Sequence, residues 1–104
     1  MPAMRKAVDE RLYLSKAAGG GMLRREIWLN KQGLVVRYNL AYINPLITSR
    51  DNGRVLGYDS AHGAPHRHWR GKVTKLEPAS FEEIEQRFQD EWTKVAKEMK
   101  RAKK

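Results

Sequence analysis

At 104 residues the chain has room for one hydrophobic core, so we expect a single domain over 1–104. Hydrophobic residues make up 40% of the chain, no run of apolar residues is long enough to cross a membrane, and the N-terminal segment lacks the apolar stretch of a secretory signal. The absence of cysteine excludes disulfides, thiolate metal sites and thiol catalysis. These properties predict a cytoplasmic protein that does not contact the membrane.

Positive charge is the strongest compositional signal. Lysine and arginine number 21 against 12 acidic residues, which gives a net charge of +9 and a field that attracts polyanions. The segment 94–104 is particularly basic, whereas 82–91 is rich in aspartate and glutamate. We therefore expect nucleic acid as a partner. The alternative interpretation is a solvated surface whose basic tail maintains solubility.

In chain order, residues 1–10 show no period and are expected to form a loose lead-in, with sheet and loops over 11–77. A short strand is expected over 11–17, followed by a glycine-rich connection. Apolar and polar residues then alternate over 22–30, and more strongly over 34–43, which predicts two further strands. The second alternation places one set of residues on a common face: Leu34, Val36, Tyr38, Leu40 and Tyr42.

A further strand is predicted over 54–59, and the Gly-, Pro- and His-rich segment 61–71 is expected to be an exposed loop or a sheet edge. Ser80 followed by Glu83 forms a capping box that predicts a helix over 80–102 with a basic tail. Apolar residues then recur at helical spacing. The connections between the predicted strands are too short for the crossovers that parallel strands need. The predicted fold class is therefore α+β, an antiparallel sheet of about four or five strands with the long C-terminal helix packed on one face.

All three histidines lie close together, at His62, His66 and His68, and imidazole can both accept and donate protons near neutral pH. If this stretch is extended, His66 and His68 point to one side and Arg67 and Trp69 to the other. Metal-independent cleavage of RNA needs a base, an acid and cations for the phosphorane. In this hypothesis, protons are exchanged by His62 and by either His66 or His68. Asp59 would orient an imidazole and Tyr58 would donate a hydrogen bond.

Basic and aromatic residues around this stretch are the candidates for nucleic-acid binding. Arg67, Arg70 and Lys72 would hold phosphate, and Trp69 would stack an unpaired base. Arg37 and Arg54, on the predicted strands, would extend the phosphate contacts. The alternative interpretation makes all of these residues, and the histidines, solvated loop or core-edge residues.

No cofactor is expected, because the established nucleotide-binding and hydrolase motifs are missing. The metal-site alternative would use His62, His66, His68 and Asp59, although their spacing matches none of the usual zinc patterns.

Three segments resemble the TumE-like toxins of bacterial toxin–antitoxin pairs. They are Tyr38-Asn39-Leu40-Ala41-Tyr42, Arg54-Val55-Leu56-Gly57-Tyr58-Asp59, and His62-Gly63 with His66-Arg67-His68-Trp69. The resemblance covers about residues 22–95. It implies a small growth-inhibiting toxin that acts on RNA and is encoded with a cognate antitoxin. The basic surface makes an acidic antitoxin an attractive partner.

The leading hypothesis is thus a toxin that acts on RNA as a metal-independent endoribonuclease. The rival hypothesis is a non-enzymatic module that binds nucleic acid or a protein partner through the same basic surface. Turnover, not salt dependence, separates the two, because counterion release weakens both kinds of complex as salt rises. The sequence leaves the oligomeric state open, a homodimer included.

Overall fold

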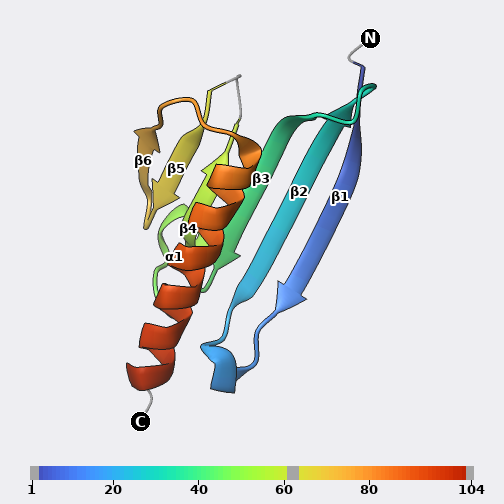
Figure 1. Ribbon diagram of the computed structural model, residues 1–104. Coiled ribbons are helices and arrows are strands. Elements are labelled where there is room, and N and C mark those ends of the chain that lie inside the picture. Colours follow the sequence, from blue (N-terminus) through green and yellow to red (C-terminus); the bar gives the residue numbers. More distant parts are fainter. Residues whose placement is uncertain (1–2, 61–63, 103–104) are drawn as a thin grey trace.

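The computed structural model describes residues 3–60 and 64–102, which form an antiparallel sheet with one long helix on one of its faces (Figure 1). Within these residues the sheet has six strands in the order β1-β2-β3-β4-β5-β6, each antiparallel to its sequence neighbours. The strands are β1 Met4–Tyr13, β2 Met22–Asn30, β3 Val35–Ile43, β4 Arg54–Asp59, β5 His66–Trp69 and β6 Lys72–Lys75. Short 3-10 turns at Lys16–Ala18 (η1) and Arg50–Gly53 (η2) precede β2 and β4. The predicted α+β class is confirmed, with six strands instead of four or five.

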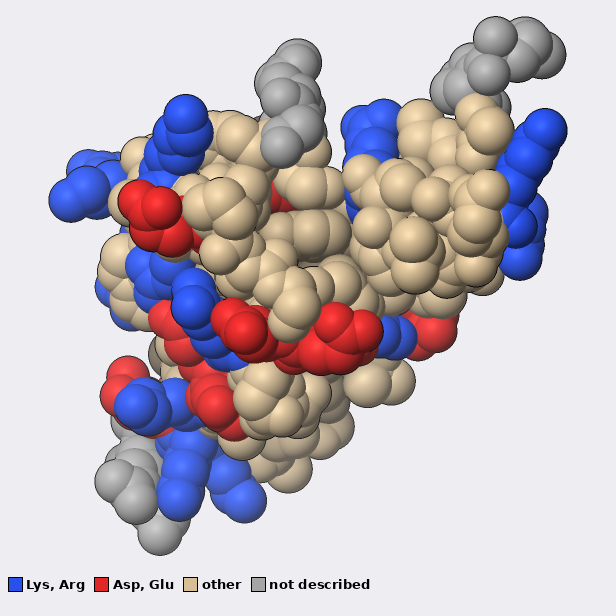
Figure 2. Space-filling model, turned by 45° about the horizontal axis from the view of Figure 1, so that its top comes forward, with Lys and Arg blue, Asp and Glu red and all other residues tan. Residues whose placement is uncertain are grey.

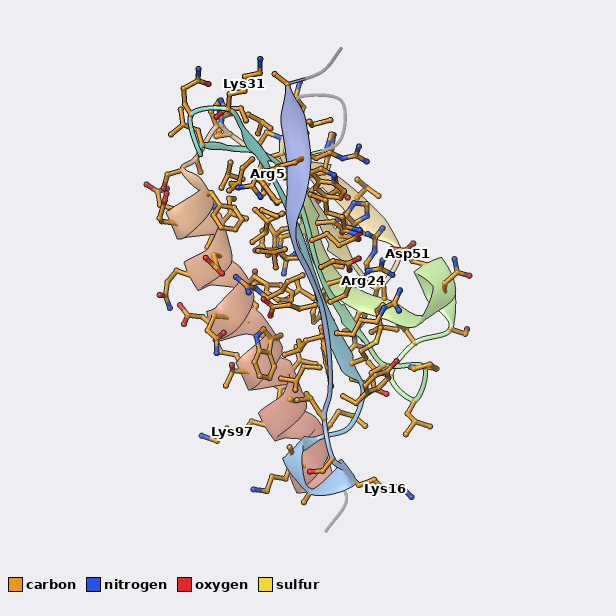
Figure 3. All side chains as sticks on the ribbon, turned by 90° about the vertical axis from the view of Figure 1, so that its right-hand side faces the viewer. Arg5, Lys16, Arg24, Lys31, Asp51 and Lys97 are labelled. Carbon is orange, nitrogen blue, oxygen red and sulfur yellow. The ribbon has the colours of Figure 1, made fainter. Side chains whose placement is uncertain are left out.

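The helix, α1 (Phe81–Ala102), begins where the capping box predicts. The Ser80 hydroxyl accepts a hydrogen bond from the Glu83 amide at 3.2 Å, which satisfies one of the unpaired donors at the helix start. The apolar stripe of α1 faces the sheet and includes the buried residues Ile84, Phe88, Val95 and Ala96. Burial of this stripe joins the two layers of the fold (Figure 3).

The core lies between α1 and the central strands β3 and β4. Tyr38, Leu40 and Tyr42 alternate along β3 with residues of the opposite face, as expected for a strand with one buried side. In the register of the sheet Leu40 pairs with Tyr58, and both are buried. The Tyr58 ring meets the Phe88 ring edge-on with centroids 6.4 Å apart. Leu40 and Tyr58 are therefore committed to packing, and their strand neighbours Asn39 and Asp59 are left for the other face.

The turn before β2 packs closely on the helix. Gly19 has φ +107°, and a Cβ at this position would lie 2.6 Å from the Ala96 carbonyl oxygen. Only glycine accommodates both the left-handed backbone and this approach. The Tyr42 hydroxyl donates a 2.9 Å hydrogen bond to the Gly20 carbonyl, which fixes the same turn to β3. This end of the β1–β2 hairpin is thereby attached to the core.

Two predictions about the strands are wrong. Residues 4–10 of the expected lead-in belong to β1, which begins at Met4. The segment 61–71, expected to be a loop or an edge, contains β5 and leads into β6. Almost all of β1 is exposed on both faces, and β6 is exposed throughout, so neither has the apolar alternation by which strands are recognised.

The two faces of the sheet differ in character. We call the face away from α1 the open face; in Figure 3, Arg24 and Asp51 lie on that side. On the helix side, basic and acidic side chains adjoin across the middle, and lysine and arginine gather near the lower end of the view, where α1 ends (Figure 2). No helix in the described part of the chain combines the length and the apolar character needed to cross a membrane.

Candidate functional site

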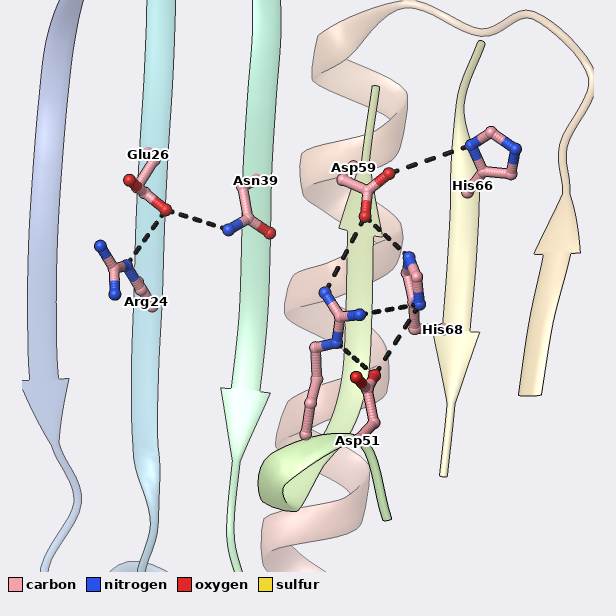
Figure 4. A network of polar contacts seen from close by, with 8 residues as sticks. Arg24, Glu26, Asn39, Asp51, Asp59, His66 and His68 are labelled. Atoms are coloured by element: carbon pink, nitrogen blue, oxygen red, sulfur yellow. Dashed lines mark hydrogen bonds and ion pairs between the residues drawn. The ribbon is translucent and has the colours of Figure 1, made fainter. Parts of the chain in front are cut away.

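The candidate site forms on the open face because of the register between β4 and β5. Asp59 pairs with His66, and Gly57 pairs with His68. Directly paired residues share a face, so both imidazoles lie beside the Asp59 carboxylate. Figure 4 shows them on the side of the sheet opposite to α1. The predicted separation of the two histidines from Arg67 and Trp69 is confirmed.

His68 is held through both of its ring nitrogens. Its Nε2 lies 2.7 Å from Asp59 Oδ2, and its Nδ1 lies 2.9 Å from Arg54 Nη2. A guanidinium only donates hydrogen bonds, so Nδ1 accepts and Nε2 carries the proton that it donates to Asp59. His68 therefore has no ring nitrogen left for a substrate. Its role in this arrangement is to position Asp59.

Arg54 extends across the open face and connects the turn η2 with the histidines. Its Nε donates to Asp51 Oδ2 at 2.6 Å, and its Nη1 lies 3.9 Å from Asp59 Oδ2. Asp51 reaches this place through a left-handed backbone with φ +51°. Gly57 leaves the space that the arginine occupies, since a Cβ there would lie 2.9 Å from Arg54 Cδ. The Gly-Tyr-Asp sequence of β4 thus serves the site as well as the strand.

His66 is the more available imidazole. Its Nδ1 lies 3.9 Å from Asp59 Oδ1, which is an ion-pair distance but longer than a hydrogen bond, and its side chain is 27% exposed against 12% for His68. Lys75 of β6 pairs with His66 in the sheet, which places a cation on the same face. A modest side-chain rotation would bring His66 Nδ1–H onto Asp59 and leave Nε2 for proton transfer.

The charge of this cluster constrains what it can bind. Asp51 and Asp59 supply two carboxylates against the single guanidinium of Arg54. Positive charge for a phosphate must therefore come from the flanks of the cluster. Lys75 lies on one flank, and Arg37 of β3 lies on the other, beside Trp28 of β2.

Tyr58 and Arg67 lie on the opposite face, away from the histidines. The Tyr58 hydroxyl donates to a carboxylate oxygen of Glu91 on α1, and Arg67 forms an ion pair with the same carboxylate. Burial, and then the hydrogen bond and the charge of Glu91, raise the pKa of Tyr58 to about 12, with Arg67 acting against them. The hypothesis that Tyr58 and Arg67 share a pocket with the histidines is therefore not supported, because both residues connect the sheet to the helix.

Replacement of Tyr58 by phenylalanine should lower the free energy of unfolding by about 1.5–3 kcal/mol, the usual value for a hydrogen bond to a charged group. The raised pKa makes this contribution complete below the unfolded pKa of about 10, and it is lost as pH rises through about 12. Urea denaturation at neutral pH and at about pH 11 measures both effects. Tyr13→Phe, at a side chain that is 73% exposed, is the control and should change little. Equal stability of the two variants would contradict the assignment.

The remaining sequence candidates lie around the site without joining it. Trp69 is on the helix side, with the guanidinium groups of Arg67 and Arg70 at 5.4 and 5.1 Å from its ring centroid. Arg70 occupies the turn after β5 with φ +47°, and Lys72 pairs with Trp69 across that turn. Of the predicted phosphate ligands, Arg54 and Arg37 are the two on the open face.

His62 lies outside the described residues. Within 3–60 and 64–102, no group of three or more His, Asp or Glu side chains is arranged to hold a metal ion.

Sequence reasoning did not find Asp51 or Lys75. Lys75 has a recognisable signal, because a hairpin that turns at Arg70-Gly71 pairs it with His66. Asp51 has a weaker signal in the turn sequence Asp-Asn-Gly, which suggests a left-handed bend but not its contact with Arg54.

On the open face the carboxylate of Asp59 thus lies beside two imidazoles: His66, which is partly exposed, and His68, whose ring nitrogens are both bonded. This set of groups is suited to proton transfer near neutral pH. No protein-family model, no curated protein and no solved structure matches this chain. A functional assignment therefore depends on the geometry described above.

Proposed function

We propose that this protein is a toxin of a toxin–antitoxin pair that acts in the cytoplasm by cleaving RNA on the open face of its sheet. The observation that carries the proposal is the convergence of His66, His68 and Asp59 beside Arg54. The net charge of +9 supports a polyanionic substrate. The resemblance of the Gly-Tyr-Asp and His-Arg-His segments to TumE-like toxins supports the biological setting.

In the proposed reaction, His66 Nε2 removes the proton of a 2′-hydroxyl, and the freed oxygen attacks the adjacent phosphorus. The bond from phosphorus to the 5′-oxygen breaks, and a second acid protonates the leaving oxygen. A 2′,3′-cyclic phosphate and a 5′-hydroxyl end result, with no oxidant, metal or other co-reactant needed. His62 is the proposed second acid on sequence grounds. Asp59 holds the His66 ring in position, and Arg37 and Lys75 stabilise the phosphorane.

Turnover of RNA tests this proposal. Purified protein is incubated with a mixed RNA pool without added metal, and the new ends are mapped by sequencing, with a His62→Ala/His66→Ala/His68→Ala variant as control. We expect discrete 5′-hydroxyl ends with the wild-type protein only. Ends that occur equally with the variant, or no new ends at any protein concentration, would contradict RNA cleavage by this cluster.

A second candidate function is supported by the engagement of His68. Both of its nitrogens are bonded, and the cluster carries two carboxylates against one guanidinium, an arrangement that is also consistent with a purely structural network. In that case the protein is a module that binds RNA or a protein partner without turnover. RNA that is retarded in a gel but remains intact in the same incubation would favour this alternative.

The proposed antitoxin is an acidic protein, which the net charge of +9 attracts and which blocks access of RNA when it is bound. Co-expression with the product of the neighbouring gene should suppress growth inhibition and yield a co-purifying complex.

A further inference from the structure

A hollow of about 290 Å³ lies on the open face between the candidate site and the outer strands. Residues of β2, β3 and β4 line it, and those whose side chains are charged or polar, or aromatic on the open face, include Glu26, Trp28, Arg37, Asn39, Arg54 and Asp59. Within this lining the negative charges of two carboxylates balance the positive charges of two guanidinium groups. The volume is at the lower end of the range for small-molecule pockets and suits one small polar group. A neutral ligand fits this balance better than a bare phosphate does.

Glu26 and Asn39 provide the hydrogen-bonding groups of the hollow. One carboxylate oxygen of Glu26 lies 2.5 Å from Lys6 Nζ. The other oxygen accepts a hydrogen bond from Asn39 Nδ2 at 3.0 Å and lies 3.1 Å from Arg24 Nε (Figure 4). Burial alone would raise the pKa of Glu26, but these hydrogen bonds and the charges of Lys6 and Arg24 lower it overall. Glu26 is thus a fixed carboxylate that holds the Asn39 amide in one orientation.

Asn39 retains an unused acceptor. Its Oδ1 is buried and has no hydrogen-bond partner among the described residues. A buried acceptor without a partner is unfavourable, and a ligand N–H group would relieve it. Asn39 lines the hollow and its Nδ2 is bonded to Glu26, so Oδ1 is the amide atom that remains for a ligand. The side chain therefore favours a ligand that donates a hydrogen bond.

Trp28 supplies an aromatic surface beside this acceptor. The guanidinium of Arg37 lies 4.7 Å from its ring centroid and the ammonium of Lys6 lies 5.2 Å away. Arg37 is exposed and, in the part of the chain that the structure describes, forms no ion pair, so it is able to move aside or to stack on a ligand itself. Tryptophan and arginine planes are the surfaces on which unpaired bases stack.

From these observations we infer that the hollow is a subsite for one nucleobase of single-stranded RNA, the base next to the phosphodiester at His66. Trp28 and Arg37 contact the plane of the base, and Asn39 Oδ1 accepts from its exocyclic amine. Arg54 and Asp59 belong both to the hollow and to the candidate site, so the two are continuous. The inference rests on the proposed binding of RNA to the open face, but it does not require that the RNA be cleaved.

Binding of uncleavable RNA tests the subsite. Fluorescein-labelled 2′-O-methyl oligomers of about eight nucleotides lack the attacking hydroxyl, so anisotropy reports affinity without turnover. Trp28→Ala should weaken binding about 5- to 100-fold, the effect of one lost base stack. The matched control is Tyr13→Ala, an exposed aromatic on the same face outside the hollow, which should change affinity by less than about 2-fold. If Trp28→Ala fails to fold, Trp28→Leu retains apolar bulk without the aromatic plane and takes its place.

Base preference tests the role of Asn39. Oligocytidine offers an exocyclic amine where oligouridine has a carbonyl, so the wild-type protein should bind the former about 2- to 10-fold more tightly. Asn39→Ala should abolish this preference while still binding both oligomers. Equal affinity of the wild-type protein for the two oligomers, or an unchanged preference in Asn39→Ala, would overturn the assignment of the acceptor.

The failures of the subsite and of the proposed function are distinguishable. Trp28→Ala and Tyr13→Ala with the same affinity would overturn the subsite even if the protein cleaves RNA. Conversely, oligomer binding that depends on Trp28, together with the absence of new ends in the RNA pool, would support the subsite and contradict catalysis.

Discussion

Replacement of His66 by alanine is expected to lower the rate of RNA cleavage about 10²- to 10⁴-fold, the usual contribution of one general base. His66 is the imidazole that is partly exposed and is not held at hydrogen-bond distance, with Asp59 Oδ1 3.9 Å from its Nδ1. Its removal breaks no hydrogen bond within the described residues, so the fold should persist. Initial rates on an end-labelled RNA, measured beside far-UV circular dichroism, separate loss of activity from loss of structure.

Thr74→Ala is the matched control for this experiment. Thr74 lies on the neighbouring strand, pairs with Arg67 on the face opposite to His66, and is exposed. The control should cleave at the wild-type rate. A His66→Ala protein that is folded and cleaves as fast as Thr74→Ala would remove His66 from the mechanism.

Asp59→Asn is expected to have the second-largest effect, a rate loss of about 10²-fold or more, because in the proposed reaction this carboxylate holds the His66 ring in position. An asparagine amide that donates toward His68 Nε2 would conflict with the tautomer that Arg54 imposes. Removing a negative charge from the open face should leave RNA affinity equal or tighter. Cleavage should therefore fall while the Kd does not rise, a combination that simple unfolding cannot produce.

Asp51→Asn serves as the control for Asp59→Asn. Asp51 carries the same charge in the same network, but it contacts Arg54 at 2.6 Å and lies 3.8 Å from His68 Nδ1, the nitrogen that already accepts from Arg54. We expect a smaller rate loss for this variant than for Asp59→Asn. Equal losses in the two variants would mean that only the net charge of the cluster matters, and the positioning role of Asp59 would have to be abandoned.

The elements that could be predicted from the sequence are those with a buried face. The alternation through Tyr38, Leu40 and Tyr42 and the capping box at Ser80 each correspond to an element of the structure, β3 and α1. The strand expected over 11–17 covers only the end of β1, and β6 was not predicted, because both strands lie at the edges of the sheet, where little of their surface is buried and no apolar period is required. Sequence patterns report burial, so they report edge strands poorly.

The candidate site was predictable in part for a related reason. Strand alternation was sufficient to place His66 and His68 together and to separate them from Arg67. It could not show that Arg67 and Tyr58 meet Glu91, since that contact joins residues far apart in the chain through the packing of α1. The hydrogen bond of Arg54 to His68 likewise depends on the path of a long side chain over Gly57.

The pairing of β4 with β5 has an evolutionary consequence. Core residues and candidate-site residues occupy alternate positions of β4, with Leu56 and Tyr58 on one side and Gly57 and Asp59 on the other. Selection for chemistry and selection for packing can therefore act on neighbouring codons almost independently. A slip of the pairing by a single residue, in contrast, would exchange the two sets at once. Such a change would cost the protein its core and its site together, so the relative alignment of these strands should be the last feature of the fold to drift.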